Sequence, residues 1–172
     1  MRLGPEMQST GEAIGVDVTF PAAFTKALLA AGVFPKTDGR PFFFSIDDRD
    51  KPEALPLAVA LHRLGIPLAA TAGTVAYLQK AGVPVATVVK KLREGSPHAV
   101  DLIRAGEVAA VINTGYSGSA MRDGFQIRRA AVERGIPCFT SLDTVRALVE
   151  TLEKREKGYH VAPIGRYRRG LV

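Results

Sequence analysis

The sequence predicts an α/β protein whose parallel sheet is covered by helices on both faces. After residue 40, short apolar segments alternate with segments of helical periodicity. The apolar segments are apolar throughout, which is typical of strands buried on both faces. A Gly-Ile-Pro or Gly-Val-Pro triplet stands three times between a helical segment and an apolar one, where glycine ends the helix and proline prevents its continuation. These triplets lie at residues 65–67, 82–84 and 135–137.

The first part of the chain is expected to be a linker followed by one helix. Residues 1–16 contain turn formers and no sustained period, so we interpret them as an arm continuing from a preceding domain. A helix is predicted from Asp17, with Asp17 or Thr19 as its cap, Pro21 in its first turn and Gly32 at its end.

The alternating part of the chain predicts five strands, at residues 41–46, 68–71, 85–89, 108–113 and 138–140. Helices follow them at residues 51–64, 74–80, 97–104, 123–134 and 143–157. Polar residues suited to cap these helices are Asp50, Thr74, Ser96, Asp123 and Asp143. Residues 159–162 are either an edge strand or part of the tail. The folded domain is therefore expected to span residues 17–160, with a basic tail at 161–172.

Composition excludes several classes of protein. The 172 residues suggest one domain, and 47% hydrophobic content is enough for a core. No apolar run approaches the roughly 18 residues of a membrane span, and the first ten residues lack the apolar region of a secretory signal. The single cysteine, Cys138, excludes an internal disulfide and a cysteine-rich metal site. A cytoplasmic protein without a membrane partner is predicted.

The net charge of +6 allows an anionic partner. Half of this charge is local, because three arginines lie within the last seven residues: Arg166, Arg168 and Arg169. The remainder of the chain carries a net charge of only +3. The folded part is thus only mildly basic. Nucleic acid is not the expected partner.

The ends of the predicted strands carry residues suited to an anion. In an open parallel sheet, ligands bind outside the carboxyl ends of the strands. Hydroxyls and free backbone N–H groups at a helix start bind phosphate, lysines neutralise it, and asparagine offers a donor and an acceptor. The candidate residues are Ser45, Lys51, Thr71, Gly73, Thr74, Lys91, Asn113, Thr114 and Asp123.

Each candidate also has a purely structural interpretation. Thr74 and Ser96 could be helix caps, and Asp123 could be either a cap or a ligand to a ribose. Lys90 and Lys91 could be a solvated pair, and residues 113–115 could be a simple turn. The convergence of several strand ends is what favours a shared anion site.

The sequence offers little for catalysis. His62 falls in mid-helix, and His98 is better interpreted as orienting its loop than as a general base. Cys138 falls in an apolar strand and should be a small core residue. Neither a dinucleotide fingerprint nor a P-loop is present. We therefore predict no catalytic residue, no metal site and no cofactor in this domain.

Five short segments together resemble one family. They are residues 3–12, 71–74, 94–98 and 112–114, and Asp123 followed by residues 127–129. Residues 3–12 resemble the linker that leaves the second ATP-grasp half of the carbamoyl phosphate synthetase large chain. The residues after this linker, to about position 157, resemble the last domain of that chain, its methylglyoxal-synthase-like regulatory domain.

This resemblance implies a three-layer Rossmann-like sandwich with a five-stranded parallel sheet and a regulatory role in arginine and pyrimidine biosynthesis. The expected effector is UMP or IMP. The expected partners are the ATP-grasp synthetase domains and, through them, the glutaminase small chain. In the nucleotide site, the phosphate would lie near Lys51, Thr71, Thr74 and Lys91.

The chain also departs from the family pattern. Gly115 and Tyr116 stand where the enterobacterial pattern has a threonine and a serine, which removes one hydroxyl. In the resembled family a tyrosine contacts ornithine, and Cys138 occupies its position here. Thr140, a second position on the ornithine-binding side, is retained.

The alternative is an enzyme of the same fold, methylglyoxal synthase, which acts on dihydroxyacetone phosphate by proton abstraction and phosphate elimination. That reaction needs a carboxylate base. The enzyme family has Gly-Gly-Asp where this chain has Glu94-Gly95-Ser96, so the base is absent here.

Overall fold

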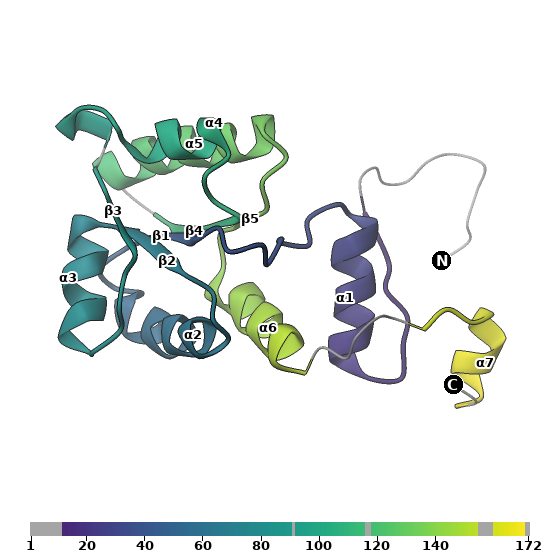
Figure 1. The fold of residues 1–172 in the computed structure, drawn as a ribbon. Helices are drawn as coiled ribbons and strands as arrows, with labels where there is room; N and C mark the ends of the chain where they lie inside the picture. The colour runs from purple at the N-terminus through teal and green to yellow at the C-terminus, as the bar shows by residue number, and fades with distance from the viewer. Residues whose placement is uncertain (1–11, 91, 116–117, 155–159, 171–172) are drawn as a thin grey trace.

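The computed structural model describes residues 12–90, 92–115, 118–154 and 160–170 (Figure 1). Its centre is a five-stranded sheet in the order β3-β2-β1-β4-β5, and every pair of neighbours is parallel. The strands are β1 (Phe42–Ile46), β2 (Leu68–Thr71), β3 (Thr87–Val89), β4 (Ala110–Thr114) and β5 (Cys138–Phe139). The predicted α/β fold class is thus confirmed.

Helices connect the strands and extend the fold at both ends. They are α1 (Phe20–Ala30), α2 (Lys51–Arg63), α3 (Ala72–Lys80), α4 (Ala99–Ala105), α5 (Gly118–Glu133), α6 (Leu142–Glu153) and α7 (Ile164–Arg168), with a 3-10 turn η1 (Leu92–Glu94) before α4. No helix in the described residues is long and apolar enough to cross a membrane.

The three layers follow from the alternation of side chains along β1. Phe42 and Phe44 are fully buried in a core formed with α1, α2, α3 and α6, whereas Phe43 packs on the other face against α4 and α5. Successive side chains of a strand point to opposite faces, so three consecutive phenylalanines supply both cores. Figure 1 shows α4 and α5 on one side of the sheet and α2 and α6 on the other.

The direction in which successive strands are added to the sheet reverses between β1 and β4. From β1 the chain proceeds through β2 to β3 and then returns to the opposite side of β1 to form β4. At this junction Ser45 lies opposite Asn113, and Ile46 lies opposite Thr114. A switch of this kind opens a crevice at the carboxyl ends of the strands, which is where ligands of such sheets bind.

Several predicted helix starts are wrong. Asp123 lies inside α5, which begins at Gly118, so the cap interpretation of Asp123 fails. Glycine and serine suggest a loop by propensity, but packing of the helix overrides that preference. Thr74 is not a cap either, because α3 starts directly after β2. Ser96 lies three residues before α4, so it is not the cap of this helix. The N-cap residue is His98, whose backbone N–H donates to the Asp101 carboxylate at 3.0 Å.

The first helix and the tail also differ from expectation. Asp17 does not cap α1, which begins at Phe20; its carboxylate pairs with the Lys26 ammonium at 2.7 Å. Lys26 also donates to the Tyr167 hydroxyl at 2.8 Å, which joins α1 to α7. The sequence did not predict α7, and residues 160–162 are not a strand. The predicted linker residues 1–11 and the helix end at residues 155–157 lie outside the described residues.

Candidate functional site

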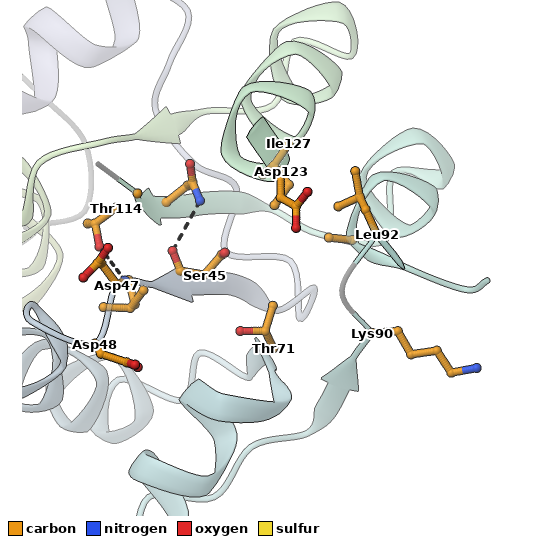
Figure 2. A pocket seen from close by; sticks show the side chains of 13 residues that line it. Ser45, Asp47, Asp48, Thr71, Lys90, Leu92, Thr114, Asp123 and Ile127 are labelled. Atoms are coloured by element: carbon orange, nitrogen blue, oxygen red, sulfur yellow. Dashed lines mark hydrogen bonds between the residues drawn. The ribbon is translucent and has the colours of Figure 1, made fainter. Parts of the chain in front are cut away.

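A pocket of about 230 Å³ opens at the carboxyl edge of the sheet, over the switch between β1 and β4. Figure 2 shows it between Thr71 at the end of β2, Ser45 on β1 and Asp123 on α5. This volume is somewhat below the roughly 300–1,000 Å³ of typical ligand pockets, so it holds at most one small molecule. The lining residues are Ser45, Ile46, Asp47, Asp48, Thr71, Lys90, Leu92, Ala99, Asn113, Thr114, Gly115, Asp123 and Ile127.

One end of the pocket has the chemistry of a phosphate site. Thr71 lies at the N-cap position of α3, and its hydroxyl makes no side-chain cap bond. The hydroxyl oxygens of Thr71 and Thr74 are 3.4 Å apart, and Thr74 is buried. A helix start with uncapped N–H groups and two adjacent hydroxyls favours an anion.

Lys51 approaches this helix start from α2. Its Nζ donates to the Gly73 carbonyl at 2.9 Å and lies 2.5 Å from an Asp48 carboxylate oxygen. The Lys51 side chain is only 12% exposed, so its position is well defined by packing. Lys51, Gly73 and Thr74 lie next to Thr71, outside the lining of the pocket itself.

Asn113 lines the pocket, and both ends of its side-chain amide are engaged in hydrogen bonds. It is 3% exposed; its Nδ2 donates to the Ser45 carbonyl at 3.3 Å, and its Oδ1 accepts from Arg128 Nη1 at 2.5 Å. Arg128 is half-buried, whereas the neighbouring Arg129 is exposed and pairs with Glu133 at 2.7 Å.

The Thr114 hydroxyl is engaged in a hydrogen bond within the protein. It accepts from the Asp47 backbone N–H at 3.0 Å, and the residue is 2% exposed. This bond fixes the loop between β1 and α2, which carries Asp47 and Asp48 to the pocket. Thr114 therefore shapes the site through this loop.

Three carboxylates face the pocket: Asp47, Asp48 and Asp123. Asp47 accepts from the Arg49 backbone N–H at 3.2 Å, and Asp48 pairs with Lys51. Asp123 has no hydrogen-bond or ion-pair partner among the described residues, which leaves its oxygens for the hydroxyl groups of a ligand. No group of three His, Cys, Asp or Glu in the described part of the chain could hold a metal ion.

The opposite wall of the pocket is apolar. Leu92 comes from η1, Ala99 from α4 and Ile127 from α5. This wall was not predicted from the ends of the strands, because apolar residues on helices show the same sequence pattern whether they face a core or a ligand. Lys90 also lines the pocket, and its Nζ donates to the Ser96 carbonyl at 3.3 Å.

Of the other residues singled out in the sequence, Lys91 and Tyr116 are outside the described part of the chain. Thr140 is exposed after β5 and does not line this pocket, so its contact with ornithine stays a prediction.

Ser96, where the enzyme family has its aspartate, donates to the Asp101 carboxylate at 2.8 Å. The His98 backbone N–H and the Ser96 hydroxyl together lower the pKa of Asp101 below its ordinary value. This cluster serves the start of α4, and neither Ser96 nor His98 lines the pocket.

Comparison with known proteins identifies relatives of this chain. Residues 53–140 match the family model of the MGS-like domain. The chain is 50% identical over 169 residues to the carbamoyl phosphate synthase large chain of Thermomicrobium roseum, covering 98% of this chain and 16% of that protein. It is 48% identical over 161 residues to the C-terminal section of the carbamoyl phosphate synthase large chain of Methanopyrus kandleri, covering 92% of this chain and 29% of that one.

These matches confirm the resemblance identified from the five segments. The chain spans less than a third of the length of either relative, and the family match runs from α2 to the end of β5, which includes every strand except β1. The residues that build the pocket after β2, β3 and β4 lie within the matched range. The chain therefore belongs to the family of MGS-like domains.

Proposed function

We propose that this chain is an allosteric regulatory domain of a glutamine-dependent carbamoyl phosphate synthetase, and that it binds UMP or IMP at the carboxyl edge of its sheet. The observation that carries the proposal is the pocket over the β1–β4 switch, which has a phosphate end, a polar centre and an apolar wall. A mononucleotide likewise combines a phosphate, a polar sugar and a base with apolar faces.

The phosphate would lie at the start of α3. There the Thr71 and Thr74 hydroxyls, the first N–H groups of the helix and the Lys51 ammonium can all donate to it. Lys91 would add a second positive charge. Asp123 would accept from ribose hydroxyls, and Leu92, Ala99 and Ile127 would pack against the base.

The similarity to carbamoyl phosphate synthase large chains supports the large-chain context of this proposal. In this proposal the nucleotide biases how the domain docks on the ATP-grasp synthetase domains, and through them on the glutaminase small chain. Such coupling is worth about 1–3 kcal/mol in typical allosteric proteins. The synthetase would belong to arginine and pyrimidine biosynthesis.

Calorimetric titration with UMP, IMP and ornithine tests the proposal. We expect one of the nucleotides to bind with a single site per chain, and Lys91→Ala to weaken that binding. If neither nucleotide binds at millimolar concentration, the proposed function is wrong.

A parallel assay with dihydroxyacetone phosphate tests the enzymatic alternative. The proposal predicts no methylglyoxal, because Ser96 stands at the position of the base and is bonded to Asp101. Turnover that is lost in a variant of a pocket carboxylate, such as Asp48→Asn, would instead establish a lyase.

A further inference from the structure

Arg128 is bonded to Asn113, which lines the candidate nucleotide pocket. The guanidinium Nη1 donates to the Asn113 side-chain oxygen at 2.5 Å, and Arg128 is not among the residues that line the pocket. Arginine has donors and no acceptor. The oxygen of the Asn113 amide must therefore be the atom that faces Arg128.

This bond decides what Asn113 can offer to a ligand. Because Arg128 holds the oxygen, the amide directs its NH₂ group toward Ser45. The Ser45 carbonyl accepts a hydrogen bond from one of the two N–H groups at 3.3 Å. The second N–H remains for a ligand. Asn113 is consequently fixed as a donor, although a free asparagine could present either end to the pocket.

A glycine inside α5 makes this contact possible. A Cβ added at Gly124 would lie 2.7 Å from Arg128 Nη1 and 2.8 Å from Asn113 Oδ1, both closer than side chains tolerate. Gly124 stands one turn before Arg128, and long side chains of a helix lean back over the preceding turn. Glycine within a helix is unfavourable relative to alanine, so its presence here agrees with a need for this close approach.

We propose that Arg128 is a positioning residue of the nucleotide site, which holds Asn113 so that its amide N–H faces the ligand. The ligand then needs a hydrogen-bond acceptor at this place, such as a carbonyl oxygen of the base or an oxygen of the ribose. The identity of the ligand rests on the proposed function, whereas the positioning of Asn113 does not.

The positioning can be tested without any ligand, because Asn113 is the single asparagine of the chain. Asparagine labelled with nitrogen-15 in its side chain gives one NH₂ signal in a nitrogen–proton spectrum. We expect this signal to shift and its protons to exchange faster with solvent in Arg128→Leu. The matched control Arg129→Leu, which changes the exposed neighbour, should leave the signal unchanged. Equal spectra for both variants would overturn the proposal.

Binding provides the second measurement. Calorimetric titration with UMP and IMP should show at least a tenfold loss of affinity in Arg128→Leu, a partial recovery in Arg128→Lys, and wild-type affinity in Arg129→Leu. In an Asn113→Ala background, Arg128→Leu should cause no further loss, since Arg128 acts through Asn113. A further tenfold loss in that background would contradict the proposal.

The two measurements separate the two hypotheses. If the wild-type chain binds neither nucleotide but the Asn113 signal responds to Arg128→Leu, the proposed function fails and the positioning stands. If a nucleotide binds and the signal does not respond, the positioning fails and the proposed function stands.

Discussion

Lys51 and Gly73 join the first turns of α2 and α3 at the carboxyl edge of the sheet. The Lys51 Nζ donates to the Gly73 carbonyl at 2.9 Å, and the Asp48 carboxylate accepts from a second of the three N–H groups of the ammonium. The third N–H can therefore reach an anion bound at the start of α3. The two existing contacts hold the ammonium in place, so little side-chain entropy is lost when that anion binds.

Lys51→Met should weaken the binding of a nucleotide roughly 10- to 150-fold. A hydrogen bond to a charged group contributes about 1.5–3 kcal/mol, and about 1.4 kcal/mol corresponds to a factor of ten. Methionine retains most of the apolar stem, so the packing of the loop changes little. Calorimetric titration with UMP and IMP measures the effect.

Lys80→Met is the matched control for this substitution. Lys80 is exposed in the last turn of α3, at the opposite end of the helix from the candidate phosphate site. Its loss should leave nucleotide affinity within a factor of two or so, since distant exposed charges are screened by salt. Equal losses in the two variants would mean that Lys51 acts only through net charge.

Gly15→Ala should lower the free energy of unfolding by about 1–3 kcal/mol, the usual cost of overpacking. A Cβ at Gly15 would overlap the Ala23 carbonyl oxygen and lie 2.7 Å from the Ala27 backbone nitrogen. Backbone atoms of α1 cannot move aside, so the segment before α1 would have to separate from the helix. Urea unfolding followed by circular dichroism gives the change.

Gly165→Ala provides the comparison, because a Cβ at Gly165 meets nothing within 4 Å. Alanine also favours the helical conformation that this residue adopts in α7. The stability of this variant should equal that of the wild type or exceed it. If both alanine variants unfold at the wild-type urea concentration, the packing of Gly15 on α1 does not contribute to stability.

The sequence predicted the sheet well because its signals are strong. Mostly apolar runs such as 41–46, together with repeated Gly-Ile/Val-Pro triplets, identified all five strands to within two residues at each end. Helix starts were predicted less well. α5 begins at Gly118, five residues before the expected cap Asp123, since tertiary packing and not local propensity decides where this helix starts.

The polar part of the site was predicted from strand ends, and its apolar and supporting parts were not. Ser45, Thr71 and Asn113 lie at the carboxyl ends of their strands and could be assigned to one edge of the sheet. Ile127 and Arg128 lie on a helix, where nothing in the order of residues tells a ligand-facing position from a core or surface position. The approach of α5 to β4 in three dimensions brings Ile127 to the pocket and Arg128 to Asn113.

Cys138 should react slowly with a disulfide reagent in the folded protein. Burial raises the pKa of its thiol to about 11, with an opposing contribution from the Arg128 charge. At pH 8 a thiol with this pKa has roughly one hundredth of the thiolate of one at its ordinary value of 9, and the thiolate is the reactive form. We expect release of the chromophore from an aromatic disulfide to accelerate at least a hundredfold in urea. A native rate equal to the unfolded rate would contradict the burial of β5.

The ion pair between Asp17 and Lys26 should make stability depend on pH in the acid range. The Lys26 ammonium holds the pKa of Asp17 below its ordinary value of 3.8. A carboxyl whose pKa is lower in the folded protein stabilises the fold above its unfolded pKa, and this contribution disappears as the pH falls through the folded value. The contribution should therefore be complete at pH 6 and lost progressively below about pH 4.

Asp17→Asn tests this dependence through thermal unfolding between pH 3 and pH 7. The wild type should be more stable than the variant at pH 6, and the difference should shrink as the pH falls below about 4, because the protonated aspartic acid then resembles asparagine. Asp143→Asn is the control, since Asp143 is 83% exposed and its pair with Arg146 should contribute little at any pH. A difference between Asp17→Asn and wild type that stays constant down to pH 3 would show that Asp17 acts through packing or hydrogen bonding rather than through its charge.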